Sequence, residues 1–139
     1  MRHNKLALYA HFIWSTWDRE WLISPEIERR LWRAIQSEAE LHGCDVIAVG
    51  GIEDHVHLLV SFPPTVAISF ILKQVKGVSS LFANAELGMD GSFKWQGGYA
   101  AFSVSRWDVK KLKNYIQNQR QHHENGTTKP ELELSDSDE

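Results

Sequence analysis

The chain has 139 residues, a length typical of a single domain. Hydrophobic residues make up 42% of it and include six Trp, six Phe and three Tyr, which excludes a chain that is disordered throughout. No apolar run approaches the ~18–20 residues of a membrane span, and the first residues do not resemble a secretory signal. The single cysteine, Cys44, excludes an internal disulfide framework, so we expect a cytoplasmic protein with one core.

The formal charge of −3 at pH 7 is unevenly distributed along the chain. Five acidic residues lie in the last ten positions, which leaves 15 basic and 13 acidic residues over positions 1–129. A mildly basic body permits nucleic-acid binding without indicating it. From residue 124 onward the composition turns to Asn, Gly, Thr, Pro, Ser and acids, which predicts a domain over 1–123 and a mobile acidic tail over 124–139.

The first half of the chain predicts three strands and a helix. Residues 6–16 are rich in aromatic and β-branched side chains, as strands are. A Ser-Pro pair and a His-Gly pair delimit a helix over about 24–42. Residues 44–52 and 55–62 are two more strands, and the two-residue link between them indicates an antiparallel hairpin.

The second half of the chain predicts two more helices and one more strand. An apolar stripe at helical spacing predicts a helix over about 66–82, residues 99–104 suit a strand, and Asp108 begins a last helix. The order is βαββαβ followed by one helix. It predicts an α+β, ferredoxin-like split βαβ fold, an antiparallel sheet with helices on one face and its other face open.

Two histidines on the third strand are candidate metal ligands. His55 and His57 are two positions apart, so both point to one side of the sheet, ~6–7 Å apart along the strand. Val56 and Leu58 then point to the side packed under the helices. The two imidazoles can converge on one divalent cation, or they are simply two solvent-facing side chains.

The last helix carries a candidate nucleophile. Tyr115 and Gln119 are four positions apart, at the edge of a stripe formed by Val109, Leu112 and Ile116. One interpretation is a tyrosine packed at a helix boundary. The other is a nucleophile beside a metal held by the two histidines and the Gln119 amide oxygen. A phenol with a pKa near 10 needs such assistance, and Mg²⁺ or Mn²⁺ can clamp a phosphate oxygen.

Basic and aromatic residues suggest how a nucleic acid could be held. Candidate contacts to its backbone are Lys73, Lys76 and Ser80 on the second long helix and Lys111 on the last one, although an ordinary solvated helix face explains them equally well. Bases could stack on Trp95, Tyr99 and Phe102, of which Phe102 better suits the core. His11 is expected on the same sheet face as His55 and His57.

Several stretches of the chain resemble one known family, the single-tyrosine HUH transposases. These are the small enzymes of single-strand-transposing insertion sequences and the related REP-associated tyrosine transposases. The similar stretches cover most of residues 11–123 in the family's order: HFIWSTWDR (11–19), DHVHLLVSFPPTVAIS (54–69), KGVSS (76–80), WQGGYAAFSVS (95–105) and YIQNQRQHH (115–123).

The resemblance implies a ferredoxin-like domain that binds single-stranded DNA folded as hairpins. His55 and His57 match the family's metal ligands, and Gln119 matches the third ligand. Tyr115 matches the nucleophile that takes the 5′-phosphate and frees a 3′-hydroxyl. Members of the family act as homodimers, and in several of them the tyrosine helix completes the partner's site in trans. For the metal held by these ligands, the donor chemistry indicates Mg²⁺ or Mn²⁺.

Other functions are compatible with the same residues. The chain could be a host-retained REP-associated nuclease that cuts and joins hairpin repeats, or a non-catalytic module that binds single strands on the open sheet face. A metal-dependent hydrolase would need a pattern such as H-x-H-x-D-H. Leu59 and Val60 occupy its last two positions, which argues against that class.

Overall fold

The computed structural model describes residues 4–134, and the sheet at its centre has four antiparallel strands in the order β2-β3-β1-β4. β1 pairs with both β3 and β4, and β2 forms a hairpin with β3. This order confirms the predicted α+β split βαβ fold. The strands are β1 (Tyr9–Ser15), β2 (Asp45–Ile52), β3 (His55–Ser61) and β4 (Ala100–Val104).

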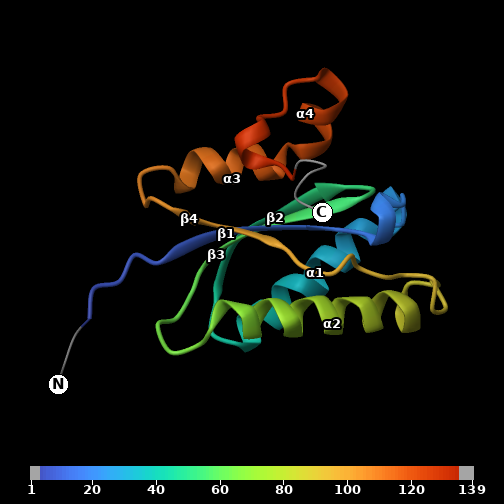
Figure 1. Cartoon of the computed structure of the whole chain (residues 1–139), viewed down its shortest axis with the longest axis horizontal. Coiled ribbons are helices and arrows are strands. Elements are labelled where there is room, and N and C mark those ends of the chain that lie inside the picture. The colour runs from blue at the N-terminus through green and yellow to red at the C-terminus, as the bar shows by residue number, and fades with distance from the viewer. Residues whose placement is uncertain (1–3, 135–139) are drawn as a thin grey trace.

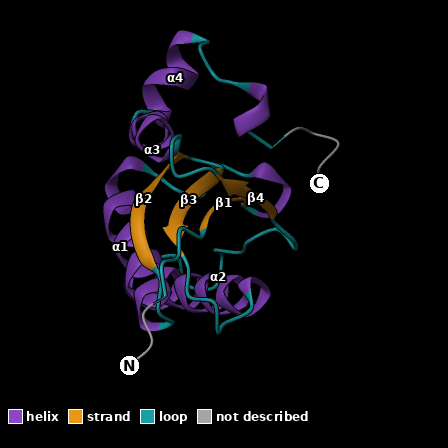
Figure 2. Cartoon of the chain, turned by 90° about the vertical axis from the view of Figure 1, so that its left-hand side faces the viewer, coloured by secondary structure: helices purple, strands orange, loops and turns teal. Residues whose placement is uncertain are grey.

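Helices lie on both faces of this sheet (Figures 1 and 2). The long helices α1 (Pro25–Leu41) and α2 (Ile68–Glu86) cover one face, and α3 (Val109–Gln117) and α4 (Gln119–Asn125) lie over the other. Two short 3₁₀ turns, η1 (Trp17–Arg19) and η2 (Pro130–Leu132), complete the elements. No helix within residues 4–134 is long and apolar enough to cross a membrane.

Strict alternation along β3 divides its side chains between two cores. Val56, Leu58 and Val60 join the main core with residues of α1 and α2. Leu59 points the other way and joins a smaller cluster with α3, as the two-residue period of a strand requires. The strand is therefore buried on both sides.

The expectation that the second sheet face is open is wrong. Leu59 on β3 and Ala48 on β2 make that face apolar, and it is covered by Leu112, Tyr115 and Ile116 of α3. Removing these side chains from water stabilises the arrangement, so the last helix becomes a second layer instead of an appendage.

The last helix also differs from the expectation of one continuous element. The chain leaves helical geometry at Asn118, which separates α3 from α4. Tyr115 therefore ends one helix and Gln119 begins the next. The second long helix starts a little later than expected, because a turn at Pro64 and Thr65 precedes Ile68. It also ends later, at Glu86.

The segment expected to be a mobile tail from residue 124 is different in the structure. Residues 124–125 end α4, and Gly126 adopts a left-handed backbone that turns the chain back. Leu132 then packs against the smaller core, and Glu133 contacts the histidines. The polar composition of this segment did not predict that the chain returns to the histidines, because a few tertiary contacts hold it there. Residues 135–139 lie outside the described part.

A glycine controls how closely α3 approaches the sheet. A Cβ at Gly50 would overlap the carbonyl oxygen of Ile116, whereas a Cβ at Gly77 of α2 would meet nothing. We expect Gly50→Ala to lower the free energy of unfolding by about 1–3 kcal/mol, because α3 must shift. Gly77→Ala should raise it by up to about 1 kcal/mol, since alanine favours the helix. Urea unfolding measures both, and equal effects would contradict the packing.

Candidate active site

Two buried histidines lie at the middle of the sheet, on the face covered by α3. His55 and His57 are 1% and 0% exposed, and their ring centroids are 5.0 Å apart. His11 on β1 lies on the same face, as expected, and its Nε2 is 2.9 Å from Nδ1 of His57. The alternation of β3 thus brings both histidines together in one interior site.

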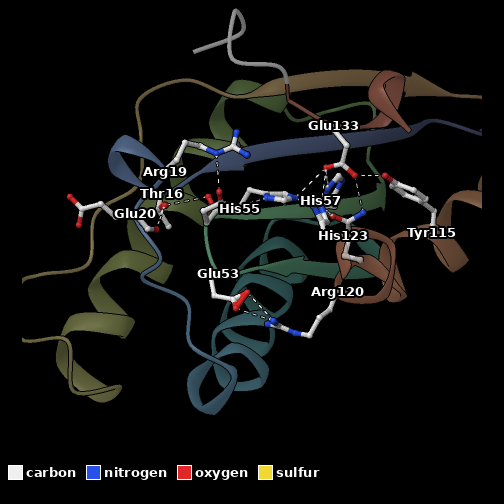
Figure 3. A network of polar contacts seen from close by, with 12 residues as sticks. Thr16, Arg19, Glu20, Glu53, His55, His57, Tyr115, Arg120, His123 and Glu133 are labelled. Atoms are coloured by element: carbon white, nitrogen blue, oxygen red, sulfur yellow. Dashed lines mark hydrogen bonds and ion pairs between the residues drawn. The ribbon is translucent and has the colours of Figure 1, made fainter. Parts of the chain in front are cut away.

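Neighbouring groups hold each imidazole by its Nδ1 side. Nδ1 of His55 donates to the Asp54 carboxylate across 2.7 Å, and Arg19 donates to the other carboxylate oxygen across 3.2 Å. His11 occupies the corresponding place beside His57. Both Nε2 atoms therefore face one shared space, which Figure 3 shows beside Glu133 and His123, as the ligating nitrogens of metal-bound histidines do.

Gln119 lies in this space, at the first turn of α4. Its Oε1 is 3.1 Å from Nε2 of His55 and 3.1 Å from Nε2 of His123. The side chain is 1% exposed, so the break after α3 directs it inward. The three side chains expected to ligate a metal are thus brought together by β3 and α4.

An arginine fixes the helix that carries Gln119. Arg120 donates to both carboxylate oxygens of Glu53 across 2.8 and 2.9 Å, and to Glu28 across 3.0 Å. Glu53, whose contact with Arg120 is shown in Figure 3, lies in the β2–β3 turn, and Glu28 lies on α1. Arg120 therefore ties α4 to two other elements. The ion pairs hold Gln119 toward the histidines.

Tyr115 reaches the same site from the end of α3. It is 4% exposed, and its ring stacks on His122 with a centroid distance of 4.6 Å. Its hydroxyl donates to the Glu133 carboxylate and accepts the backbone N–H of Lys129 across 3.0 Å. A single chain therefore places this tyrosine beside its own histidines.

Glu133 is the member of the site that the sequence did not predict. Its Oε1 lies 3.0 Å from Nε2 of His57 and 3.2 Å from Nε2 of His55. Its Oε2 accepts from Gln119 Nε2 across 3.0 Å and from the Tyr115 hydroxyl. No local motif surrounds this residue, which is one acid among several at the end of the chain. The one signal that could have indicated a return of the chain is Gly126, because glycine favours turns.

The two histidines have opposite protonation preferences. Burial acts to lower the pKa of His55, but hydrogen bonds to the Asp54 and Glu133 carboxylates outweigh it and raise this pKa to about 9. Burial lowers the pKa of His57 to about 4 despite its contact with Glu133. Burial and the neighbouring His57 likewise lower the pKa of His11 to about 3. One cationic and two neutral imidazoles share the site.

The tyrosine and the glutamate are shifted in opposite directions. Burial, reinforced by the Glu133 carboxylate, raises the pKa of Tyr115 to about 12. Burial acts to raise the pKa of Glu133, but hydrogen bonds from His55, His57 and the tyrosine hold it well below its usual range. The site therefore holds a neutral phenol against a carboxylate anion.

The donor set suits a hard or borderline divalent cation. His55, His57 and Glu133 offer ligand atoms that all lie within 4.8 Å of one another, and Gln119 adds an amide oxygen. Carboxylate and amide oxygens favour Mg²⁺ and Mn²⁺, and the imidazoles shift the preference toward Mn²⁺. The residues present thus fit a metal of this class.

A cavity of about 360 Å³ opens beside Tyr115, between β4 and α3. Lys111 lines it, so this predicted DNA contact lies next to the tyrosine. Phe102 also lines it and is exposed, which corrects the expectation of a core position, because β4 is an edge strand. Tyr99 is exposed as well, whereas Trp95 is buried in the main core.

The other predicted DNA contacts lie away from the histidines. Lys73, Lys76 and Ser80 are on α2, which covers the opposite face of the sheet (Figure 1). The ammonium of Lys76 donates to the backbone oxygens of Gln96 and Gly98 across 2.8 and 2.7 Å. Lys76 therefore holds the loop before β4, while Lys73 is exposed to solvent.

Replacing these two lysines separates a structural role from a binding role. We expect Lys76→Ala to lower the free energy of unfolding by about 1–3 kcal/mol, because two charge-assisted hydrogen bonds are lost. Lys73→Ala, on the same helix, should change it by less than about 0.5 kcal/mol. Urea unfolding distinguishes them, and an unchanged stability of Lys76→Ala would show that the loop does not depend on this ammonium.

The chain is similar in sequence to known transposases. Residues 4–119 match the family described as IS200-like transposases. The chain is 28% identical over 117 residues to the ISDra2 transposase TnpA of Deinococcus radiodurans, covering 81% of this chain and 84% of that one. It is 24% identical over 125 residues to the transposase for insertion sequence element IS200 of Salmonella typhimurium, covering 86% and 81%.

Solved structures share the fold. A crystal structure of a protein from Deinococcus radiodurans R1, assigned as a transposase, superposes with a TM-score of 0.66 and 25% identity, covering 86% of this chain and 98% of that one. The structure of a REP-associated tyrosine transposase bound to a REP hairpin gives a TM-score of 0.63 at 13% identity, covering 92% and 76%. With the family match spanning most of the chain, the protein belongs to the IS200-like transposases.

Proposed function

We propose that this transposase cleaves and rejoins hairpin-bearing single-stranded DNA through a 5′-phosphotyrosine intermediate. The observation that carries the proposal is that the Tyr115 hydroxyl, the Nε2 atoms of His55 and His57, and the Gln119 carboxamide all contact one group, the Glu133 carboxylate. A nucleophile and metal-ligating groups are the two requirements of metal-assisted phosphoryl transfer.

The covalent step is a transesterification. The Tyr115 oxygen attacks the phosphorus of the scissile phosphodiester and loses its proton, and the bond from phosphorus to the 3′ oxygen breaks. The released 3′ oxygen takes up a proton, and the strand on the other side stays attached through its 5′-phosphate. A second 3′-hydroxyl reverses the step on a new junction, so the number of phosphodiester bonds is conserved.

The residues of the chain have separate parts in this step. His55, His57 and Gln119 would hold a Mg²⁺ or Mn²⁺ ion, which polarises a phosphate oxygen when bound. Asp54 and His11 orient the two imidazoles. Lys111, on the cavity beside the tyrosine, is placed to contact the phosphate backbone. The more distant Lys73, Lys76 and Ser80 are proposed to contact flanking DNA only.

The substrate and assembly follow from the relatives by analogy. The REP-associated neighbour is bound to a REP hairpin, which supports hairpin-bearing DNA as the substrate here. We propose a homodimer, as expected from the family resemblance, with the tyrosine acting beside its own histidines or in trans. The single cysteine favours the reducing cytoplasm as the location of the reaction.

The nucleophile is tested by Tyr115→Phe, with Tyr99→Phe as the matched control. We expect Tyr115→Phe to abolish cleavage of a labelled hairpin oligonucleotide and to leave DNA affinity within about threefold, because only the attacking oxygen is lost. Tyr99→Phe should cleave normally. Denaturing gels detect the covalent adduct. Cleavage by Tyr115→Phe at the rate of the unmodified protein would refute the assignment, and binding without any adduct in the unmodified protein would indicate a non-catalytic module.

The metal site is tested through the residue that orients His55. Asp54→Asn weakens the acceptor of the Nδ1 proton, so we expect the Mn²⁺ affinity to fall about 10- to 100-fold. Asp45→Asn, at the other end of the β2–β3 hairpin, should leave it unchanged. Isothermal titration calorimetry measures both, and EDTA should stop cleavage. An unaltered Mn²⁺ affinity in Asp54→Asn would remove Asp54 from the site.

A further inference from the structure

We propose that Glu133 is a fourth protein ligand of the divalent cation, and that the cation thereby docks residues 126–134 onto the site. The proposal rests on the metal site described under the proposed function and adds a residue and a segment to it. The family match ends at residue 119, so neither Glu133 nor this segment lies within the matched region.

The spacing of the donor atoms fits one coordination sphere. Glu133 Oε1 is 3.0 Å from Nε2 of His57 and 3.2 Å from Nε2 of His55, and Gln119 Oε1 is 3.1 Å from Nε2 of His55. Ligands at right angles around a cation with bonds of ~2.1 Å are ~3.0 Å apart. Three donor pairs among these four side chains therefore have the separation that adjacent octahedral positions require.

The atoms around Nε2 of His55 are electron-pair donors. Asp54 accepts the Nδ1 proton of His55, so loss of the Nε2 proton leaves the lone pair of Nε2 directed at the site. Oxygens of Gln119 and Glu133 lie next to this nitrogen and are the acceptors of its proton. A divalent cation would replace that proton and be held by the same three atoms.

The charge of Glu133 leads to the same conclusion. Its side chain is 12% exposed. Within residues 4–134 the groups that contact its carboxylate are imidazoles, a phenol and an amide, and no lysine or arginine is among them. A shielded carboxylate needs a compensating positive charge; the His55 imidazolium supplies one, and a divalent cation bound in place of its proton would supply two.

Other contacts of residues 126–134 hold Glu133 at the site. Gly126 turns the chain back after α4, and Thr127 N–H donates to the backbone oxygen of His122 across 2.9 Å. Leu132 packs against the smaller core, directly before Glu133. A cation at this point would join β3, α4 and the tail, so metal binding and docking of the tail are coupled.

The experiment compares Glu133→Ala with Glu131→Ala, which removes an exposed carboxylate from the same short turn. Mn²⁺ affinity is measured by titration calorimetry, and hydrogen–deuterium exchange follows the peptide covering residues 126–134 with and without Mn²⁺. We expect Glu133→Ala to bind Mn²⁺ about tenfold or more weakly and to lose the metal-dependent slowing of exchange in this peptide. Glu131→Ala should match the unmodified protein in both.

The outcomes separate this inference from the proposed function. Equal Mn²⁺ affinity and equal protection in both glutamate variants, with binding lost in His57→Ala, would overturn the role of Glu133 and leave the histidine site intact. No Mn²⁺ or Mg²⁺ binding by the unmodified protein would overturn the metal site itself and this inference with it. Thermal unfolding of each variant establishes that a loss of binding does not reflect a loss of fold.

Discussion

Burial of β3 on both faces is the constraint on which the rest of the molecule depends. A strand in this position sends alternate side chains into two different interiors, and here one interior is apolar while the other receives His55 and His57. The cost of burying two imidazoles is offset only where each ring finds partners, which Asp54, His11 and Glu133 provide. The site is thus part of the interior of the fold.

The second helical layer, α3 and α4, brings the other side chains of the site to the histidines. Gly50 lets the backbone of α3 approach β2 closely, which brings Tyr115 over the histidines. The break at Asn118 then turns Gln119 inward, and Arg120 holds α4 against two other elements. Each of these features positions a side chain of the site and takes no part in a reaction itself. Their joint effect is to bring a phenol, two imidazoles and an amide together, as the proposed phosphoryl transfer requires.

The family match identifies the class of protein, and the geometry of the site supports a proposal for how it works. The match over residues 4–119 establishes an IS200-like transposase, and the arrangement of side chains indicates how such an enzyme could work. The body is only mildly basic, so under the proposed function the shape of a hairpin would have to supply part of the DNA affinity. Beyond the matched region, the return of the chain to the site is a property of this molecule's own packing.

The sequence by itself determined the order of the elements, the split βαβ topology and the pairing of His55 with His57 on one strand face, because these depend on short-range periodicity. It also marked Tyr115 and Gln119, through a family resemblance more than through helix geometry. Only the tertiary structure decided that α3 covers the second sheet face, that the helix breaks at Asn118 and that Glu133 joins the site. Those features arise from contacts between residues distant in the chain, such as Ala48 with α3, which local patterns do not encode.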